Sequence, residues 1–207
     1  MPLIYSHQIN AATKIGVWHI TEGEDFFLTA VTLQRNITHP HKRLQHLAGR
    51  YLLRELYPNF PVEMIAIADT RKPFLEDEAF HFSISHCGDY AAVIVSTQSR
   101  VGVDIEIPHL KIENIQHKFL SEKEQLMLAK ERAEYHVSLT MAWSIKEAIF
   151  KWYGSGEVDF IKHMEIIALQ NSKGIYTAEC LFKKEKSVNI FVHSIIQNGN
   201  KLSWIIT

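Results

Sequence analysis

Apolar and polar residues alternate along several short segments of the chain, which is the period of a β-strand with one buried face. Strands are expected at residues 3–9, 15–20, 62–69, 80–86, 90–97, 101–107, 163–170, 175–182, 188–196 and 201–207. A polar Asn-Ala-Ala-Thr turn joins the first two strands, and Asn198 with Gly199 supplies a tight turn between the last two. Both connections predict antiparallel hairpins.

Helical spacing of apolar residues predicts four helices, at residues 22–33, 38–58, 120–129 and 134–154. Thr38 is the expected N-cap of the first long helix, and Pro58 ends it. Ser121 and Glu124 have the spacing of a capping box at the start of the second short helix. Gly154 ends the second long helix.

The order of these elements divides the chain into two similar halves, residues 1–99 and 100–207, each with a long helix beside several strands. No linker rich in Pro, Gly or Ser separates them. We therefore expect an α+β fold of two closely packed lobes, each a long helix on a small, mainly antiparallel sheet. A binding cleft between the lobes is expected, because ligands commonly bind at such boundaries.

Composition narrows the function. With 207 residues, 46% hydrophobic and 22% charged, the chain can bury a substantial core. A net charge of -1 gives no overall basic field for nucleic acid, so any anion site must be local. No apolar run approaches the ~20 residues of a membrane span, and the N-terminus lacks a secretion-signal pattern. Cys87 and Cys180 form no C-x-x-C pair, so a cytoplasmic location is expected.

The strand at 101–107 carries two carboxylates among valines and isoleucines. Because strand side chains alternate, Gly102, Asp104 and Glu106 share one face while the apolar residues share the other. A half-exposed strand with one wet face would show the same pattern. Two carboxylates pointing the same way are also what a hard divalent cation requires.

The second long helix carries Trp143, Glu147 and Lys151 at steps of four, on one helical face. A surface salt bridge between Glu147 and Lys151 is the simpler interpretation. The surrounding helix is mostly apolar, however, so these charged side chains are not expected to face open water. This setting favours a functional pair.

Five motifs, in order and at the correct spacing, resemble the signature of the Sfp-like 4'-phosphopantetheinyl transferases. They are RKP at 71–73, FSISHCGDYAAVIVS at 82–96, VGVDIE at 101–106, FLSEKE at 119–124 and WSIKEAIFKWYGSG at 143–156. The resemblance implies a two-lobed monomer with a pseudo-twofold axis and coenzyme A in the cleft. It also implies the Mg2+-dependent transfer of phosphopantetheine to a serine of an acyl or peptidyl carrier protein, which releases adenosine 3',5'-bisphosphate.

The resemblance also assigns roles to residues. Asp104, Glu106 and Glu147 would bind Mg2+, which prefers octahedral oxygen ligation. Glu147 or Glu124 would take the proton of the serine, and sequence alone does not separate the two. Lys151 would balance charge on the leaving phosphate or donate a proton to it.

Further residues are expected to bind coenzyme A. They are Arg43, Arg50, Arg71, Lys72, Pro73, Ser85, His86 and Lys151. Arg71 departs from the family, which usually has a glycine there; the change removes backbone freedom but adds a possible phosphate ligand. A non-catalytic module of the same fold that binds coenzyme A or a carrier protein is the alternative function.

Overall fold

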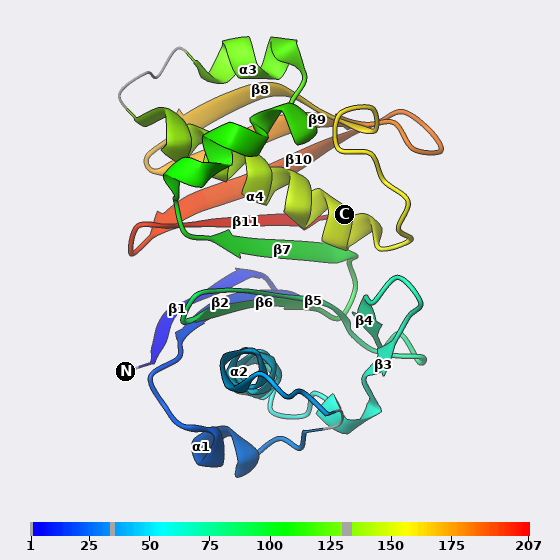
Figure 1. The fold of residues 1–207 in the computed structure, drawn as a ribbon. Helices are drawn as coiled ribbons and strands as arrows, with labels where there is room; N and C mark the ends of the chain where they lie inside the picture. Colours follow the sequence, from blue (N-terminus) through cyan, green and yellow to red (C-terminus); the bar gives the residue numbers. More distant parts are fainter. Residues whose placement is uncertain (1, 34–35, 130–133) are drawn as a thin grey trace.

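The computed structural model describes residues 2–33, 36–129 and 134–207, and Figure 1 shows its two stacked halves. The first half holds a four-stranded antiparallel sheet in the order β1-β2-β6-β5, and the second a five-stranded one in the order β7-β11-β10-β9-β8. These strands are β1 (Leu3–Asn10), β2 (Thr13–His19), β5 (His81–Cys87), β6 (Tyr90–Ser96), β7 (Val101–Glu106), β8 (Met164–Ser172), β9 (Ile175–Phe182), β10 (Val188–Gln197) and β11 (Asn200–Ile206). We call residues 2–99 the N-terminal lobe and residues 100–207 the C-terminal lobe.

Helices and short elements complete the described ranges. They are α1 (Glu24–Leu28), α2 (Pro40–Leu56), the 3-10 helices η1 (Val62–Met64) and η2 (Leu110–Lys118), the short strands β3 (Ala66–Ile67) and β4 (Pro73–Phe74), α3 (Glu122–Leu128) and α4 (Tyr135–Tyr153). The mixed fold with antiparallel sheets and few helices confirms the expected fold class. Within these ranges no helix combines the length and the apolar character that a membrane crossing requires.

Three local expectations are corrected. Residues 62–69 do not form one strand, because Pro61 precedes a 3-10 turn that buries Val62, and only Ala66–Ile67 pairs as β3. The first long helix begins at Pro40, so His39 rather than Thr38 is its N-cap, and the His39 ring accepts a hydrogen bond from the backbone N–H of Lys42. The helix η2 was not expected, since its sequence has no clear apolar period.

Three apolar clusters hold the layers together. One lies between α2 and the first sheet, and another lies between α4 and the second sheet. The third lies between the two sheets, where Val101, Val103 and Ile105 of β7 pack with residues such as Ile15 and Ile94 of the N-terminal lobe. The apolar face of β7 therefore looks into the N-terminal lobe, and its other face looks toward α4, as the alternation predicted.

Two serine side chains join the edge of β7 to β5. The hydroxyl of Ser83 accepts a hydrogen bond from the N–H of Val103 (3.2 Å), and that of Ser85 accepts one from the N–H of Ile105 (3.3 Å). A buried backbone N–H group without a hydrogen-bond partner destabilises the fold. The two hydroxyls therefore supply acceptors for the backbone N–H groups along this edge of β7. The two lobes thereby meet at a fixed register.

Gly102 sets the distance between β7 and α4. A Cβ atom at this position would lie 2.2 Å from the carbonyl oxygen of Ala148 and 2.7 Å from the backbone nitrogen of Trp152. Both are backbone atoms of α4 and cannot move aside separately. The glycine of the VGVDIE motif therefore lets the helix approach the strand closely, which brings Lys151 over Asp104.

We expect Gly102→Ala to destabilise the fold by about 1–3 kcal/mol, because the new methyl group overpacks the contact between β7 and α4. Urea unfolding followed by circular dichroism measures this change. Gly23→Ala is the matched control, since nothing lies within 4 Å of a Cβ there and the backbone φ is negative. Equal stabilities for the two variants would refute the close-approach role of Gly102.

Candidate active site

Asp104, Lys151 and Ser85 form a compact triangle at the junction of the lobes. The Lys151 ammonium lies 2.6 Å from Oδ1 of Asp104 and donates a hydrogen bond to the Ser85 hydroxyl oxygen at 2.7 Å. Ser85 in turn donates to the same Asp104 oxygen at 2.8 Å. Only 2% of Asp104 is exposed, so the ammonium offsets a carboxylate that is otherwise removed from water.

Glu106 is held by two donors, one on each carboxylate oxygen. The indole N–H of Trp143 on α4 donates to Oε1 at 3.1 Å, and the thiol of Cys87 donates to Oε2 at 3.2 Å. Burial and the negative charge of Asp104 raise the pKa of Glu106. Helical spacing predicts Trp143 on the same face as Glu147, but the sequence pattern does not indicate this positioning role for Trp143 or Cys87.

Glu147 completes a group of three carboxylates from β7 and α4. Burial, and then the negative charge of Asp104, raise the pKa of Glu147 to about 7, while the Lys151 ammonium acts in the opposite direction. Like charges close together in a site of low dielectric favour protonation of one of them. The charges of Asp104 and Glu106, the other two residues that the resemblance assigned to a metal ion, both act on Glu147.

The donor chemistry of this group fits a hard cation. The second oxygen of Asp104, Oδ2, is buried and has no hydrogen-bond partner among the described residues, and three carboxylates are ligands of the kind that Mg2+ takes. No group of three or more His, Cys, Asp or Glu side chains is already gathered around a common point in the described ranges. Asp104 faces Lys151, and Glu106 faces Trp143 and Cys87, so the carboxylates have separate partners.

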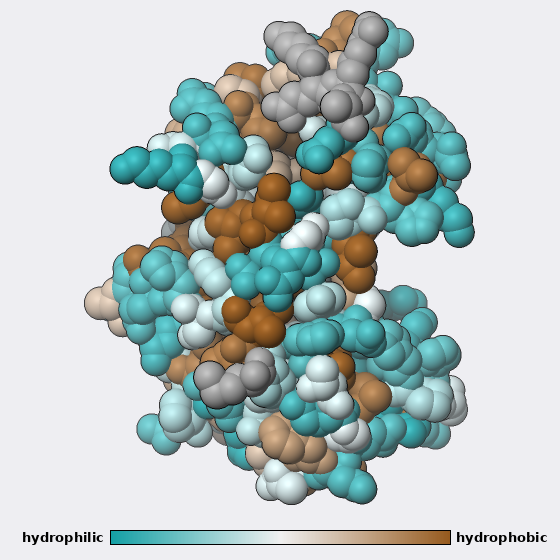
Figure 2. Space-filling model, turned by 90° about the vertical axis from the view of Figure 1, so that its left-hand side faces the viewer, coloured by the Kyte–Doolittle hydropathy of each residue, from teal (hydrophilic) through white to brown (hydrophobic). Residues whose placement is uncertain are grey.

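A pocket of about 420 Å³ lies next to the triangle and collects several of the predicted coenzyme A ligands. Arg71, Lys72, Pro73 and Lys151 line it, together with apolar side chains such as Phe150. The pocket lies by β4 and the C-terminal end of α4, at the right-hand side of Figure 1; Figure 2 shows the opposite side of the molecule. The structure therefore places these four residues together at the interlobe boundary.

Arg71 has a left-handed backbone conformation at the position where the family that the motifs resemble usually has a glycine. Its φ is 66°, in the left-handed region that side chains other than glycine enter only at a cost. The side chain is exposed at the rim of the pocket and forms no ion pair within the part of the chain that the structure describes. Arg71 therefore places a guanidinium at the edge of a turn whose backbone conformation favours glycine.

The other predicted coenzyme A ligands lie elsewhere or are already engaged. Arg43 forms an ion pair with Glu24 at 2.6 Å, and Arg50 is only 6% exposed and bonded to His46 at 3.1 Å. Burial of the Arg50 guanidinium inside the N-terminal lobe argues against a phosphate contact. His86 follows Ser85 on β5, and partial desolvation together with the Lys151 charge lowers its pKa.

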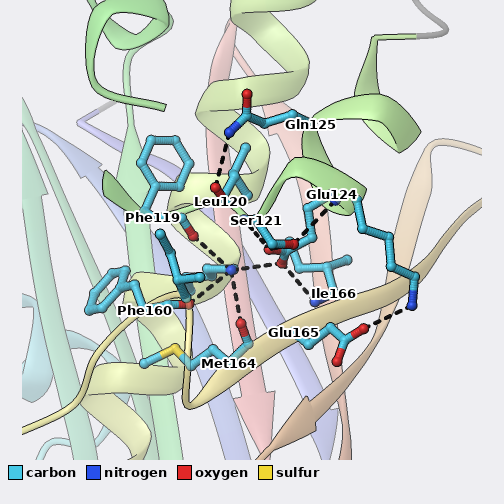
Figure 3. Close-up of polar contacts among 12 residues, drawn as sticks. Phe119, Leu120, Ser121, Glu124, Gln125, Phe160, Met164, Glu165 and Ile166 are labelled. Atoms are coloured by element: carbon cyan, nitrogen blue, oxygen red, sulfur yellow. Dashed lines mark hydrogen bonds and ion pairs between the residues drawn. The ribbon is translucent and has the colours of Figure 1, made fainter. Parts of the chain in front are cut away.

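Glu124 lies in a second, fully buried polar network that Figure 3 shows. Its carboxylate accepts hydrogen bonds from Ser121 and from the N–H of Ile166, and it forms an ion pair with the Lys146 ammonium at 2.7 Å. Lys146 also donates to the carbonyl oxygens of Phe119, Phe160 and Met164, at 2.7–2.9 Å. The capping box is confirmed.

This network favours a structural role for Glu124, which was one of the two expected bases. Glu124 is 1% exposed and Lys146 is 0% exposed, so neither side chain has contact with solvent in the cleft. The pair instead ties α3, β8 and the loop before β8 to α4. The sequence signal was the polar Lys146 within an apolar helix, next to Glu147, but helical position alone does not show which of two adjacent residues points inward.

Comparisons with known proteins agree with the motifs. The family model of the 4'-phosphopantetheinyl transferase superfamily matches residues 100–204. Enterobactin synthase component D of Escherichia coli O157:H7 is 36% identical over 117 residues, which cover 53% of this chain and 54% of that protein. The protein of the same name from Salmonella austin is 34% identical over 116 residues (53% and 47%).

A third relative is the 4'-phosphopantetheinyl transferase AcpT of Salmonella typhimurium, 31% identical over 116 residues, which cover 55% of this chain and 60% of that protein. The chain spans about half the length of the curated relatives it matches. The family match includes β7 and α4, which carry Asp104, Glu106, Glu147 and Lys151.

The raised pKa of Glu147 predicts a pH-dependent stability. Because the pKa of Glu147 is higher in the folded protein than in the unfolded chain, the folded protein binds this proton more tightly. The resulting contribution to the free energy of unfolding is complete below about pH 4.3 and is lost as the pH rises through about 7. In EDTA, the wild type should lose on the order of 2–3 kcal/mol relative to Glu147→Gln between about pH 5 and about pH 8.

Unfolding titrations of both proteins at several pH values provide this measurement. Glu122→Gln serves as the control, because it neutralises an exposed carboxylate at the start of α3. Its stability should follow the wild type across the range. Parallel stability curves for the wild type and Glu147→Gln would show that the carboxylates do not repel one another.

The buried pair of Lys146 and Glu124 predicts a partial rescue. Lys146→Met should cost about 3–5 kcal/mol, because it leaves a buried carboxylate without its counter-charge. Adding Glu124→Gln should restore part of this stability, since no isolated buried charge remains. Urea unfolding compares the variants, with Lys183→Met as a control that removes only a surface partner of Glu165 and costs at most about 1 kcal/mol. A double variant no more stable than Lys146→Met would contradict this account.

Proposed function

Because the chain belongs to the 4'-phosphopantetheinyl transferase superfamily, we propose that it transfers the 4'-phosphopantetheine arm of coenzyme A to a serine of an acyl or peptidyl carrier protein. Adenosine 3',5'-bisphosphate is the second product. The enzyme acts as a monomer, with its cleft formed by both lobes of one chain. The observation that carries this proposal is the set of three carboxylates beside the Lys151 ammonium at the interlobe pocket.

Mg2+ is the proposed cofactor, with Asp104, Glu106 and Glu147 as its ligands. The unpartnered Oδ2 of Asp104 and the raised pKa values of the two glutamates support this assignment, because each would gain from a nearby cation. When bound, the ion would neutralise negative charge on the pyrophosphate of coenzyme A. Trp143 and Cys87 orient Glu106 for that role through their hydrogen bonds.

Coenzyme A is proposed to lie along the pocket that Arg71, Lys72 and Lys151 line. Guanidinium and ammonium groups are the side chains that hold phosphate oxygens. The apolar wall of the same pocket, with Phe150, suits the uncharged parts of the substrate. His86 adds a polar side chain at the end of β5, one residue beyond the Ser85 hydroxyl.

The chemical step is a displacement at phosphorus. The carrier serine oxygen forms a bond to the phosphorus that bears the pantetheine arm, and the bond from that phosphorus to the bridging oxygen of the pyrophosphate breaks. Glu147 takes the serine proton as the general base. The Lys151 ammonium balances the negative charge that develops on the leaving phosphate. The buried and fully engaged Glu124 supports the choice of Glu147 as the base.

The decisive experiment is the intact mass of a purified apo carrier protein after incubation with this protein, coenzyme A and Mg2+. We expect the mass of the carrier protein to increase by one phosphopantetheine group. We expect no such increase when EDTA is present. Glu147→Gln should lower the rate by at least about a hundredfold, because it removes a proposed metal ligand and base. Glu122→Gln, an exposed residue of α3, should react like the wild type.

Several carrier types from fatty-acid, polyketide and nonribosomal-peptide systems should be tested, because the partner depends on surface shape. Coenzyme A binding without any mass gain on these carriers would favour a non-catalytic module of the same fold. A mass gain that persists in EDTA and in Glu147→Gln would refute the proposed roles of the carboxylates.

A further inference from the structure

We propose that a pocket at the start of α4 binds a zwitterionic, apolar small molecule of the class of a free aliphatic α-amino acid. The pocket measures about 350 Å³, at the lower end of the usual range for small-molecule sites. Residues of α3, α4, β8, β9 and β10 line it, in the upper half of the molecule in Figure 1. None of the lining residues is assigned above to Mg2+, coenzyme A or catalysis, so this proposal is independent of the proposed function.

The floor of the pocket is apolar. Leu128 and Met141 are only 6% and 3% exposed, and Leu169 packs against the same apolar cluster. Met127 and Ile196 continue the apolar wall toward the surface. Methionine side chains are flexible and adapt to the shape of an apolar ligand. The interior therefore suits an aliphatic side chain rather than a polar one.

A carboxylate lies at the mouth of the pocket. Glu134, the N-cap residue of α4, is exposed, and it is the one charged side chain on the described lining. Its carboxylate has no hydrogen bond or ion pair with another residue of the described ranges. A ligand ammonium group would form a charge-assisted hydrogen bond with it.

Lys201 supplies a positive charge beside the same end of the pocket. It stands directly opposite Ile196 in the pairing of β10 with β11, so the two side chains project from the same face of the sheet. Lys201 is 2% exposed, and its ammonium has no hydrogen bond or ion pair within the part of the chain that the structure describes. Burial lowers the pKa of Lys201, and the negative charge of Glu134 acts in the opposite direction. A carboxylate from a ligand would therefore compensate a buried charge that lacks a partner.

The N-terminal end of α4 adds partial positive charge at this position. The 19-residue helix begins at Tyr135, no acidic residue occupies its first turn, and its N-cap residue makes no side-chain capping bond. Helix N-termini attract carboxylates. A ligand with only an ammonium group would be repelled by Lys201, and one with only a carboxylate would be repelled by Glu134. An α-amino acid carries both groups on one carbon and can face both residues at once.

The test is an NMR titration of the full chain, isotope-labelled in its methionine methyl groups, with L-leucine. Met127 and Met141 lie on the pocket wall, whereas Met64 and Met164 do not. We expect saturable shifts of the Met127 and Met141 methyl signals and unchanged signals for Met64 and Met164. Single substitutions of methionine by leucine assign the signals.

Two analogues separate the charges of the ligand. Isoamylamine is leucine without its carboxylate, and isocaproate is leucine without its ammonium group. Each should bind at least about tenfold more weakly than L-leucine, because each loses a charge-assisted contact. Lys201→Met should weaken leucine binding by at least about tenfold but should not weaken isoamylamine binding. Glu134→Gln should weaken leucine binding by a similar factor but should not weaken isocaproate binding.

Lys186→Met and Glu122→Gln are the matched controls, because each removes the same charge from an exposed side chain outside the pocket lining. Both should bind leucine like the wild type. Val137→Phe is a third variant, which leaves both charges in place and puts a larger side chain into the pocket from α4. It should abolish leucine binding, and it keeps the test decisive even if Lys201→Met does not fold.

The proposal is overturned if millimolar leucine produces no saturable shift of the Met127 and Met141 signals. It is also overturned if isoamylamine or isocaproate binds as tightly as leucine, or if Lys201→Met and Glu134→Gln both leave the leucine affinity unchanged. Unaltered binding by Val137→Phe would place the ligand elsewhere and would overturn the assignment of the pocket.

Discussion

The ion pair between Lys151 and Asp104 is the contact on which the rest of the site depends. It places one ammonium among three carboxylates, in surroundings that already raise the pKa values of Glu106 and Glu147. Without that positive charge, a 2%-exposed Asp104 would lack compensation, and an isolated buried charge costs several kcal/mol. Because Ser85 touches both partners, the same contact also fixes the N-terminal lobe against the C-terminal lobe.

A rigid frame holds these charges in place from two sides. Gly102 allows the backbone of α4 to lie directly on β7, and the serine hydroxyls of β5 bond to the free edge of β7. On the far side, the buried Lys146 ties α4 to three backbone carbonyls and to Glu124. Lys146 and Glu147 are adjacent in sequence but have different roles. Lys146 belongs to the buried structural network, and Glu147 belongs to the candidate active site.

The frame also accounts for where this chain departs from the pattern of its superfamily. Arg71 occupies a left-handed backbone position, and such a position persists only when its surroundings determine it. The neighbouring Thr70 donates to the carbonyl oxygen of Gly154, and Lys72 donates to that of Trp152. This turn is thus bonded to the end of α4, and Arg71 lies on the pocket of about 420 Å³ beside it.

The sequence alone determined most of the strands, the long helices and the shared face of Gly102, Asp104 and Glu106, because these depend on local periodicity. It also identified Glu147 and Lys151, since a charged pair within an apolar helix is visible in the pattern. Only the tertiary structure paired the buried Glu124 with Lys146, paired Glu106 with Cys87, and set Arg100 beside Lys72. These outcomes depend on which side chains meet in the folded protein. Contacts between residues that are distant in sequence produce no periodic pattern in the local sequence, so the sequence does not predict them.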